Sequence, residues 1–222
     1  MRTVIFDLDG TLADTSGDLI AAANACFEAL GLGAPLDPAR DQGTAFRGGR
    51  AMLRLGFERV RPGWSEGDVD AQFPLLLDYY GANIDLYTTL YPGAAEAAER
   101  LRTGGYALGI CTNKPAGLAE TLLARLGVRD LFASLVGADT LPVRKPDPAP
   151  YRAAVERAGG SPARSMLIGD TETDRATARA AGVPCALVTF GPEGRAVADL
   201  DPEALLDDFA DLYDLAGSIL RD

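Results

Sequence analysis

The sequence of 222 residues predicts an α/β fold, with a parallel sheet as its core and a small all-helical domain inserted near its start. Two features predict this fold. From residue 91 onward, short apolar runs alternate with helix-like segments, and that order produces a parallel sheet covered by helices on both faces. Residues 32–83 instead carry helical periodicity without a strand signal. The expected organisation is a core of residues 1–14 and 84–222 and a helical insertion over 15–83.

The chain begins with a strand and then becomes helical. Val4–Phe6 is β-branched or aromatic and too short for a helix, so a buried strand is expected there. The next segment, residues 17–31, has an acid in its first turn and a closing glycine, which are signals of helix ends. Apolar residues three and four apart predict a helix at 66–81, and another is expected near 50–60. The glycine-rich stretch Thr44–Arg50 is predicted to be a loop.

The second part of the chain is a regular series of strands and helices. Each helix is followed by a glycine, and each strand is a short apolar run bounded by polar or turn residues. Residues 195–222 are acidic and are expected to be helical. The other expected helices are 93–103, 116–126, 148–158 and 174–181, and the expected strands are Tyr106–Cys111, Leu135–Gly137, Ser165–Ile168 and Cys185–Thr189.

The composition excludes several classes of function. The net charge is −11, which does not favour nucleic acid or an anionic membrane, and no apolar run approaches the ~18 residues of a membrane span. Without histidine, a Ser-His-Asp triad or a His-ligated zinc site cannot be built. The three cysteines are far apart, and the apolar run before the first acids is too short for a signal peptide. We therefore expect a cytoplasmic protein.

Two acids, Asp7 and Asp9, directly follow the first strand. In extended chain, residues two apart point to the same side, and ligands of open parallel sheets sit outside the carboxyl ends of the strands. Two carboxylates held so close repel each other unless a metal or a shared proton compensates them. The pair is therefore expected to belong to an active site.

Three later strand ends also carry polar residues. Taken singly, each has an ordinary explanation, because Asp, Asn, Thr and Gly are frequent in loops and helix caps and most lysines are solvated. The chain has only two lysines against nineteen arginines, however, and both lie at such strand ends. The four strand ends in succession therefore favour one functional constellation. The later groups are Thr112-Asn113-Lys114, Lys145, and Asp170 with Asp174.

This set of residue types suits phosphoryl transfer. The carboxylates of Asp7 and Asp170 are the hard oxygen ligands that Mg²⁺ takes together with a phosphate. Asp7 can attack phosphorus and form an aspartyl-phosphate, while Asp9 can give a proton to the leaving oxygen and later activate water. Lys145 supplies the positive charge that an acidic chain otherwise lacks. The expected donors to the phosphoryl oxygens are Thr112, Asn113 and the turn at Gly10 and Thr11.

These residues resemble the four motifs of the haloacid dehalogenase superfamily of phosphohydrolases, over nearly the whole chain. The resemblance implies a three-layer, Rossmann-like core with a helical cap inserted after the first motif. It also implies that Asp7 is the nucleophile, that Asp9 is acid and base and gives its backbone carbonyl to Mg²⁺, and that Asp170 is the third metal ligand. Asp174 is implied to support the metal's water shell or to orient Lys145. The motifs are Asp7-Leu-Asp-Gly-Thr11, Thr112-Asn113, Lys145 and Gly169-Asp170-x-x-x-Asp174.

Several stretches are similar to the phosphoglycolate phosphatase branch of that superfamily, among them Tyr91-Pro-Gly and Cys111-Thr-Asn-Lys-Pro115. The loop Phe46-Arg-Gly-Gly-Arg50 departs from the branch at Arg50, where a second glycine is usual. Arg47 and Arg50 are either a bidentate site for a substrate carboxylate or second phosphate, or solvated arginines in an Arg-rich chain.

The predicted function is that of a Mg²⁺-dependent phosphoric monoester hydrolase acting on a small phosphorylated metabolite, with 2-phosphoglycolate as the leading candidate. The protein is expected to act as a monomer or homodimer, without nucleic acid or membrane. A sugar phosphomutase or a pyrophosphatase of the same superfamily is the alternative. A receiver-type signalling module belongs to a different class, and it fits less well because it is about half this length and has no inserted cap.

Overall fold

The chain folds into two compact units. The computed structural model describes residues 1–221. One unit, here called the core unit, consists of Met1–Asp14 and the chain from Leu90 onward, and the other, the helical unit, is Thr15–Thr89. Residues 84–89, expected at the start of the core, are thus part of the helical unit.

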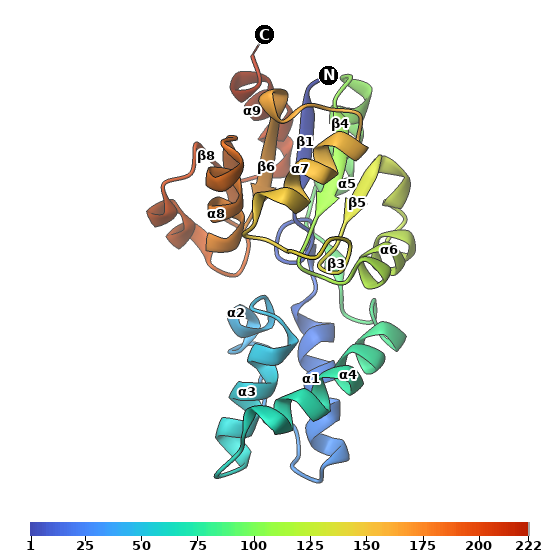
Figure 1. Cartoon of the computed structure of the whole chain (residues 1–222), viewed down its shortest axis with the longest axis vertical. Coiled ribbons are helices and arrows are strands. Elements are labelled where there is room, and N and C mark those ends of the chain that lie inside the picture. The colour runs from blue at the N-terminus through green and yellow to red at the C-terminus, as the bar shows by residue number, and fades with distance from the viewer. Residues whose placement is uncertain (222) are drawn as a thin grey trace. The chain divides into compact units, whose positions relative to one another are not determined.

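A six-stranded parallel sheet forms the centre of the core unit (Figure 1). β1 (Thr3–Phe6) lies between β4 (Ala107–Cys111) and β6 (Ser165–Gly169), with Val4 beside Leu108 and Met166. Every residue of β1 is buried, as expected for a central strand that is covered on both faces. The spatial order is β5 (Ser134–Val136), β4 (Ala107–Cys111), β1 (Thr3–Phe6), β6 (Ser165–Gly169), β7 (Cys185–Val188) and β8 (Ala204–Leu206).

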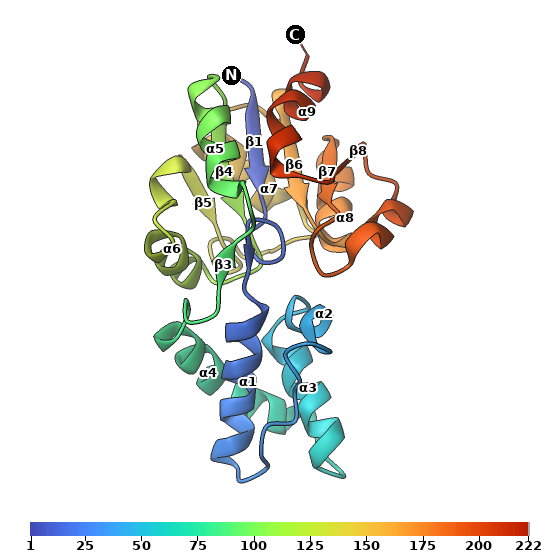
Figure 2. The same ribbon diagram turned by 180° about the vertical axis from the view of Figure 1, so that it is seen from behind.

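Helices cover both faces of this sheet. α7 (Pro148–Arg157) and α8 (Glu172–Ala181) lie on the face seen in Figure 1, and α5 (Ala94–Thr103) and α9 (Leu212–Ile219) lie on the face seen in Figure 2. α6 (Ala116–Arg125) packs beside β5. The predicted α/β fold with a parallel sheet between two helical layers is therefore confirmed. Short 3₁₀ helices lie at Arg129–Leu131, Pro162–Arg164, Gly194–Leu200 and Phe209–Asp211.

The expectation that residues 195–222 are wholly helical is wrong. α9 is helical, but Ala204–Leu206 forms the edge strand β8. The Ala-Leu-Leu sequence shows neither alternation nor β-branched residues, so its local pattern does not indicate a strand. The strand forms because its backbone pairs with β7, with Leu206 beside Val188.

The helical unit consists of α1 (Ser16–Ala29), α2 (Gln42–Ala45), α3 (Gly49–Val60) and α4 (Glu66–Ala82). Phe27 of α1 and Phe57 of α3 meet edge to face with their ring centroids 4.9 Å apart. A Cβ atom on Gly56 would overlap the ring of Phe27, so a glycine is what permits this close approach. The stretch Thr44–Arg50, expected to be a loop, includes the end of α2 and the start of α3, and Arg50 is helical.

Two short strands that the sequence pattern did not indicate, β2 (Ala13–Asp14) and β3 (Thr89–Leu90), pair in a separate sheet. Within the helical unit, the buried Asp18 carboxylate accepts hydrogen bonds from the Thr88 amide at 2.9 Å and the Thr88 hydroxyl at 2.7 Å. Asp18 thereby connects the first turn of α1 to the chain segment that leaves the helical unit.

Within residues 1–221, no helix has both the length and the apolar character that crossing a bilayer requires.

Candidate active site

The predicted site residues of the core unit gather at the carboxyl ends of neighbouring strands. Asp7 follows β1, Thr112 follows β4 and Asp170 follows β6, and these three strands are adjacent in the sheet. Lys145 reaches the same place from the segment after β5, at the sheet's edge. The parallel order of the strands is therefore what brings together residues that are far apart in the sequence.

Asp7 is a mostly buried carboxylate held by two donors. Its Oδ1 atom accepts a hydrogen bond from the Leu8 amide at 2.7 Å and lies 3.0 Å from the Lys145 ammonium. Burial raises the pKa of Asp7 to about 6, against the lowering effect of Lys145, and the nearby carboxylates of Asp174 and Asp9 add to the rise. The group is thus an acid that is ionised at neutral pH but has less solvation than a surface carboxylate.

Lys145 is fixed between two carboxylates. Its Nζ lies 2.7 Å from Asp174 Oδ1 as well as 3.0 Å from Asp7, and its side chain is only 2% exposed. Burial alone lowers the pKa of this ammonium, but Asp174 and Asp7 outweigh that effect and keep it above its ordinary value. The side-chain amide of Asn113 donates to the backbone carbonyl of Lys145 at 3.0 Å. The lysine is therefore a permanently charged, well-positioned cation.

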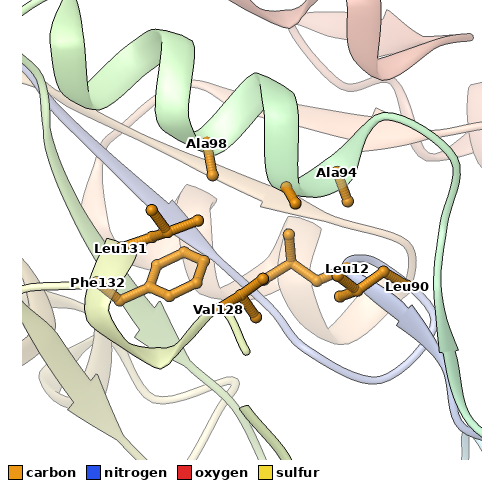
Figure 3. A pocket seen from close by; sticks show the side chains of 8 residues that line it. Leu12, Leu90, Ala94, Ala98, Val128, Leu131 and Phe132 are labelled. Carbon is orange, nitrogen blue, oxygen red and sulfur yellow. The ribbon is translucent and has the colours of Figure 1, made fainter. Parts of the chain in front are cut away.

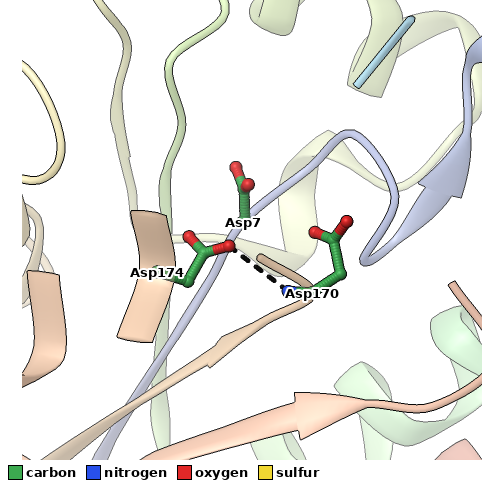
Figure 4. A group of neighbouring side chains, drawn as sticks. All are labelled: Asp7, Asp170 and Asp174. Atoms are coloured by element: carbon green, nitrogen blue, oxygen red, sulfur yellow. Dashed lines mark hydrogen bonds between the residues drawn. The ribbon is translucent and has the colours of Figure 1, made fainter. Parts of the chain in front are cut away.

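Asp174 uses both of its carboxylate oxygens within the protein. Oδ1 binds Lys145, and Oδ2 accepts hydrogen bonds from the Thr171 hydroxyl at 2.7 Å and from the Thr171 amide at 3.2 Å. Oδ2 also accepts from the Asp170 amide at 3.3 Å (Figure 4). Thr171 and Asp174 form a capping box at the start of α8. The helix end that positions Asp174 is thus the same structure that positions Lys145.

The two carboxylate oxygens of Asp170 have different environments. Oδ1 accepts a hydrogen bond from the Thr11 hydroxyl at 2.7 Å, while the buried Oδ2 has no hydrogen-bond partner among the described residues. Gly10, with a φ of 82°, lies so close to this carboxylate that a Cβ there would overlap it. Gly191, in the loop after β7, also lies close to this turn, since a Cβ on it would lie 2.9 Å from the Gly10 carbonyl oxygen and 3.3 Å from the Asp170 Cβ atom.

A divalent cation fits this group of acids. Carboxylate oxygens of Asp7, Asp170 and Asp174 lie within 4.8 Å of one another (Figure 4). Because both oxygens of Asp174 are already engaged, Asp7 and Asp170 are the two carboxylates with capacity for a metal. Burying a carboxylate oxygen that lacks a hydrogen-bond partner, as Asp170 Oδ2 does within residues 1–221, costs free energy unless a cation compensates it. Burial, together with the charges of Asp174 and Asp7, raises the pKa of Asp170 well above its usual range. The donor set, oxygen only, suits a hard ion.

Asp9 has a partner that the sequence did not reveal. Its Oδ1 lies 2.6 Å from the ammonium of Lys114, whose side chain is 4% exposed, while that of Asp9 is 19% exposed. The Lys114 amide donates to the Thr112 hydroxyl oxygen at 3.1 Å. Sequence reasoning placed Lys114 at this strand end without giving it a role. The signal was present, because Lys114 is one of only two lysines and the other is Lys145.

The predicted phosphate donors differ in what they contact. The Gly10 amide donates to the Ala13 carbonyl at 2.9 Å, and the Thr11 hydroxyl is directed to Asp170. Both groups therefore stabilise the site through hydrogen bonds to other residues of the protein. Thr112 is buried beside Lys114, and its hydroxyl oxygen accepts from the Lys114 amide, which leaves the hydroxyl proton as a donor.

The two predicted specificity residues belong to the helical unit and have different environments there. Arg50 forms an ion pair with Asp70 at 2.5 Å and lies over the ring of Phe73 at 4.5 Å. Arg47 is exposed. The charge of Arg50 is therefore already compensated by an acid of the same unit.

An apolar pocket in the core unit is part of the hydrophobic packing. It is lined by uncharged, apolar side chains and has essentially no room for a water molecule (Figure 3). It therefore offers no ligand site. The labelled residues are Leu12, Leu90, Ala94, Ala98, Val128, Leu131 and Phe132.

The core unit is thus a parallel α/β fold with a carboxylate at the end of a central strand, beside a fixed lysine and a second acid, an arrangement suited to an anionic ligand. The chain belongs to the haloacid dehalogenase-like hydrolase family, whose model matches residues 1–182. That family membership also confirms the resemblance stated from the motifs. Phosphatases of this family generally use a divalent metal, in keeping with the carboxylate cluster.

Similar proteins include several phosphatases. The chain is 37% identical over 219 residues to a phosphoglycolate phosphatase of Mesorhizobium japonicum, a match covering 98% of this chain and 96% of the relative. It is 38% identical over 220 residues to a phosphoglycolate phosphatase of Rhodospirillum rubrum, covering 97% and 91%.

Solved structures of phosphatases and related proteins have similar folds. A predicted phosphoglycolate phosphatase from Haemophilus somnus is 26% identical and superposes with a TM-score of 0.85 over 97% of each chain. CbbY from Rhodobacter sphaeroides, in complex with phosphate, is 25% identical with a TM-score of 0.77 over 96% of each. Together these similarities support a phosphoric monoester hydrolase.

Proposed function

We propose that this protein is a Mg²⁺-dependent phosphatase that hydrolyses a small phosphorylated metabolite, with 2-phosphoglycolate as the leading substrate. One observation carries the proposal: the carboxylate of Asp7 faces the fixed ammonium of Lys145, beside a buried Asp170 oxygen that has no hydrogen-bond partner within residues 1–221. A nucleophile, a cation and an incomplete metal site thus meet at one strand end.

Asp7 is the proposed nucleophile. Its carboxylate attacks phosphorus, the bond between phosphorus and the leaving oxygen breaks, and an aspartyl-phosphate forms. Lys145 neutralises charge on the phosphoryl oxygens and also prevents Asp7 from turning away, because it contacts the same oxygen that accepts from Leu8.

Asp9 is the proposed acid and base. It gives its proton to the leaving oxygen, and it later takes a proton from the water that attacks the aspartyl-phosphate. The Asp9 side chain is more exposed than that of Asp7, which suits a group that meets both the leaving alcohol and water. The Thr112 hydroxyl is the proposed donor to a phosphoryl oxygen.

Asp7 and Asp170 would hold Mg²⁺ through their carboxylates, with the Asp9 backbone carbonyl as a third protein ligand. When bound, the ion supplies positive charge that offsets the repulsion between the acids and the substrate phosphate. Asp174 orients Lys145, and Thr11 holds Asp170 in place.

The helical unit is the proposed cap, with Arg47 and Arg50 as candidates for recognising the substrate's second anionic group. Arg47 is the stronger of the two, because Arg50 already has Asp70 as its partner. The proposed location is the cytoplasm, in keeping with three cysteines that remain free thiols.

A substrate panel tests the proposal. Purified protein is incubated with 2-phosphoglycolate, sugar phosphates, a hexose bisphosphate, nucleotides and pyrophosphate, with Mg²⁺ and with EDTA, and released phosphate is measured. We expect Mg²⁺-dependent release with the highest kcat/KM on 2-phosphoglycolate. Isomerisation of a sugar phosphate without phosphate release indicates a mutase, preference for pyrophosphate indicates a pyrophosphatase, and no turnover of any phosphate overturns the proposal.

A further inference from the structure

The loop that follows β7 lies against the candidate metal site, although none of the motifs that predicted this site includes it. A Cβ atom on Gly191 would lie 2.9 Å from the Gly10 carbonyl oxygen and 3.3 Å from the Asp170 Cβ atom. The first distance is well below ordinary van der Waals contact, and the atom at its other end belongs to the backbone. With the backbone in this arrangement, position 191 therefore has room only for a residue without a side chain.

The turn that Gly191 approaches carries part of the proposed metal site. The Asp9 carbonyl, which is proposed as a ligand of Mg²⁺, belongs to the peptide next to that of the Gly10 carbonyl. Thr11, the following residue of the turn, donates its hydroxyl to Asp170 Oδ1 at 2.7 Å. A displacement of the Gly10 carbonyl would therefore move the Asp9 carbonyl and also the hydrogen bond that orients Asp170.

Aromatic packing holds this loop in place. The ring of Phe190 packs against the rings of Tyr91 and Phe209, with the centroids 5.1 Å apart in each pair. The Tyr91 amide donates to the Leu12 carbonyl at 2.9 Å, so Tyr91 contacts both the loop after β7 and the end of the turn after β1. The loop and the turn are therefore anchored to the same residue.

We propose that Phe190 and Gly191 are positioning residues for the divalent cation, because they fix how closely the turn at Gly10 lies to Asp170. This inference rests on the proposed function, to which the metal site belongs, and it gives a role to a fourth neighbouring strand end. Mg²⁺ demands near-ideal ligand geometry, so small displacements of its ligands weaken its binding. Residues that hold the ligands of a metal in place typically change its affinity about 10- to 100-fold when they are replaced.

Metal binding in the absence of substrate tests the inference. Mn²⁺, a paramagnetic ion that also takes oxygen ligands, is titrated into wild type, Gly191→Ala and Gly117→Ala, and Mg²⁺ is then added as a competitor. We expect Gly191→Ala to bind both ions about 10- to 100-fold more weakly than wild type. Gly117→Ala is the matched control, because a Cβ at that position of α6 meets no atom within 4 Å, and it should bind them as wild type does.

Two further measurements separate metal binding from folding and from the reaction itself. The melting temperature in EDTA reports any loss of folding without metal. In a phosphatase assay of Gly191→Ala, the Mg²⁺ concentration for half-maximal rate should rise by the same factor as the dissociation constant. The rate at saturating Mg²⁺ should stay close to that of wild type, because no reacting group is removed. Phe190→Leu loosens the loop without adding an atom beside Gly10, and its Mn²⁺ affinity should fall by up to about 10-fold.

The possible outcomes are distinguishable. If Gly191→Ala has a lower melting temperature but binds Mn²⁺ as tightly as wild type, the loop serves only the fold, and the inference is overturned while the proposed function stands. If Gly191→Ala does not fold, Phe190→Leu decides, and an unchanged Mn²⁺ affinity in that variant overturns the inference. If wild type binds neither ion, or if Asp170→Asn binds Mn²⁺ as tightly as wild type, the proposed metal site is wrong and the inference fails with it.

Discussion

The two acids after β1, Asp7 and Asp9, differ in the residues that they contact. Asp7 shares Lys145 with Asp174, and its Oδ1 is also held by the Leu8 amide. Asp9 instead meets Lys114. Two carboxylates of the same chemical type, two residues apart, therefore experience different fields, and this difference suits one for attack and the other for proton transfer.

The burial of Asp7 predicts a pH-dependent cost to stability. Its pKa is about 6 in the folded protein against an ordinary value of 3.8, so the folded state holds the proton up to a higher pH than the unfolded chain. Without metal, the folded protein therefore loses stability as the pH rises from about 4 to about 6. Asp7→Asn cannot ionise, so its stability relative to wild type should increase over this range, by roughly 3 kcal/mol at most.

Urea unfolding in EDTA at pH 4.5 and pH 7.5 measures this difference. Lys145 keeps Asp174 as its partner in the variant, so an uncompensated buried charge is avoided. A stability difference between variant and wild type that is the same at both pH values would contradict the raised pKa.

Asp174 should affect catalysis through Lys145. Replacing it by asparagine removes one negative partner of the ammonium while keeping an oxygen for the cap of α8. We expect kcat to fall on the order of 10- to 100-fold, as for other groups that orient an active-site residue, with a smaller change in KM. Glu172→Gln is the matched control, because Glu172 is an exposed acid in the same first turn. Equal losses in the two variants would argue against a role for Asp174 in positioning Lys145.

The sequence reveals the residue types of the site but not all of its pairings. Asp7, Lys145 and Asp170 could be predicted because each follows an apolar strand in a parallel order. The role of Thr11 could not, since its hydroxyl bonds Asp170, 159 positions away. Lys114 and Asp9 are 105 positions apart. Which donor meets which acceptor is decided by three-dimensional packing, and no local pattern encodes it.

At the scale of elements, the strands and helices with strong local signals were predictable. β1 and β6 are wholly buried and mostly apolar, and α8 has both a capping box and a closing glycine. β8 and α2 were missed because three or four residues carry too little periodicity to distinguish them from a loop. Such short elements form through pairing or packing with neighbours that the local sequence does not contain.

The contact between α1 and α3 gives a test at this scale. In Gly56→Ala, the new methyl group overlaps the Phe27 ring, so we expect the helical unit to lose about 1–3 kcal/mol of stability. Gly67→Ala, in α4, is the control, because its nearest neighbour would be Ser65 Oγ at an ordinary 3.5 Å. Chemical unfolding followed by the fluorescence of Trp64 in the same unit measures both. If Gly56→Ala leaves the free energy of unfolding unchanged, α1 and α3 can move apart without a loss of stability, which would contradict this prediction.

At the scale of the whole molecule, the proposed chemistry is concentrated in the core unit. The proposed nucleophile, the proposed acid and base, both lysines and the candidate metal ligands all lie within residues 1–14 or beyond residue 90. The helical unit has its own hydrophobic core and contains the two candidate specificity residues, Arg47 and Arg50. The roles proposed for the core unit can therefore be tested by substitutions that leave every residue of the helical unit unchanged.

Trapping of the covalent intermediate tests the central claim most directly. Wild type and Asp7→Asn are mixed with Mg²⁺ and 2-phosphoglycolate, quenched in acid, digested and analysed by mass spectrometry, with released phosphate measured in parallel. We expect one phosphate on the peptide that contains Asp7 in the wild type, and neither adduct nor turnover in Asp7→Asn. Substantial turnover by Asp7→Asn, or a phosphate on another residue, would contradict the assignment of Asp7 as the nucleophile.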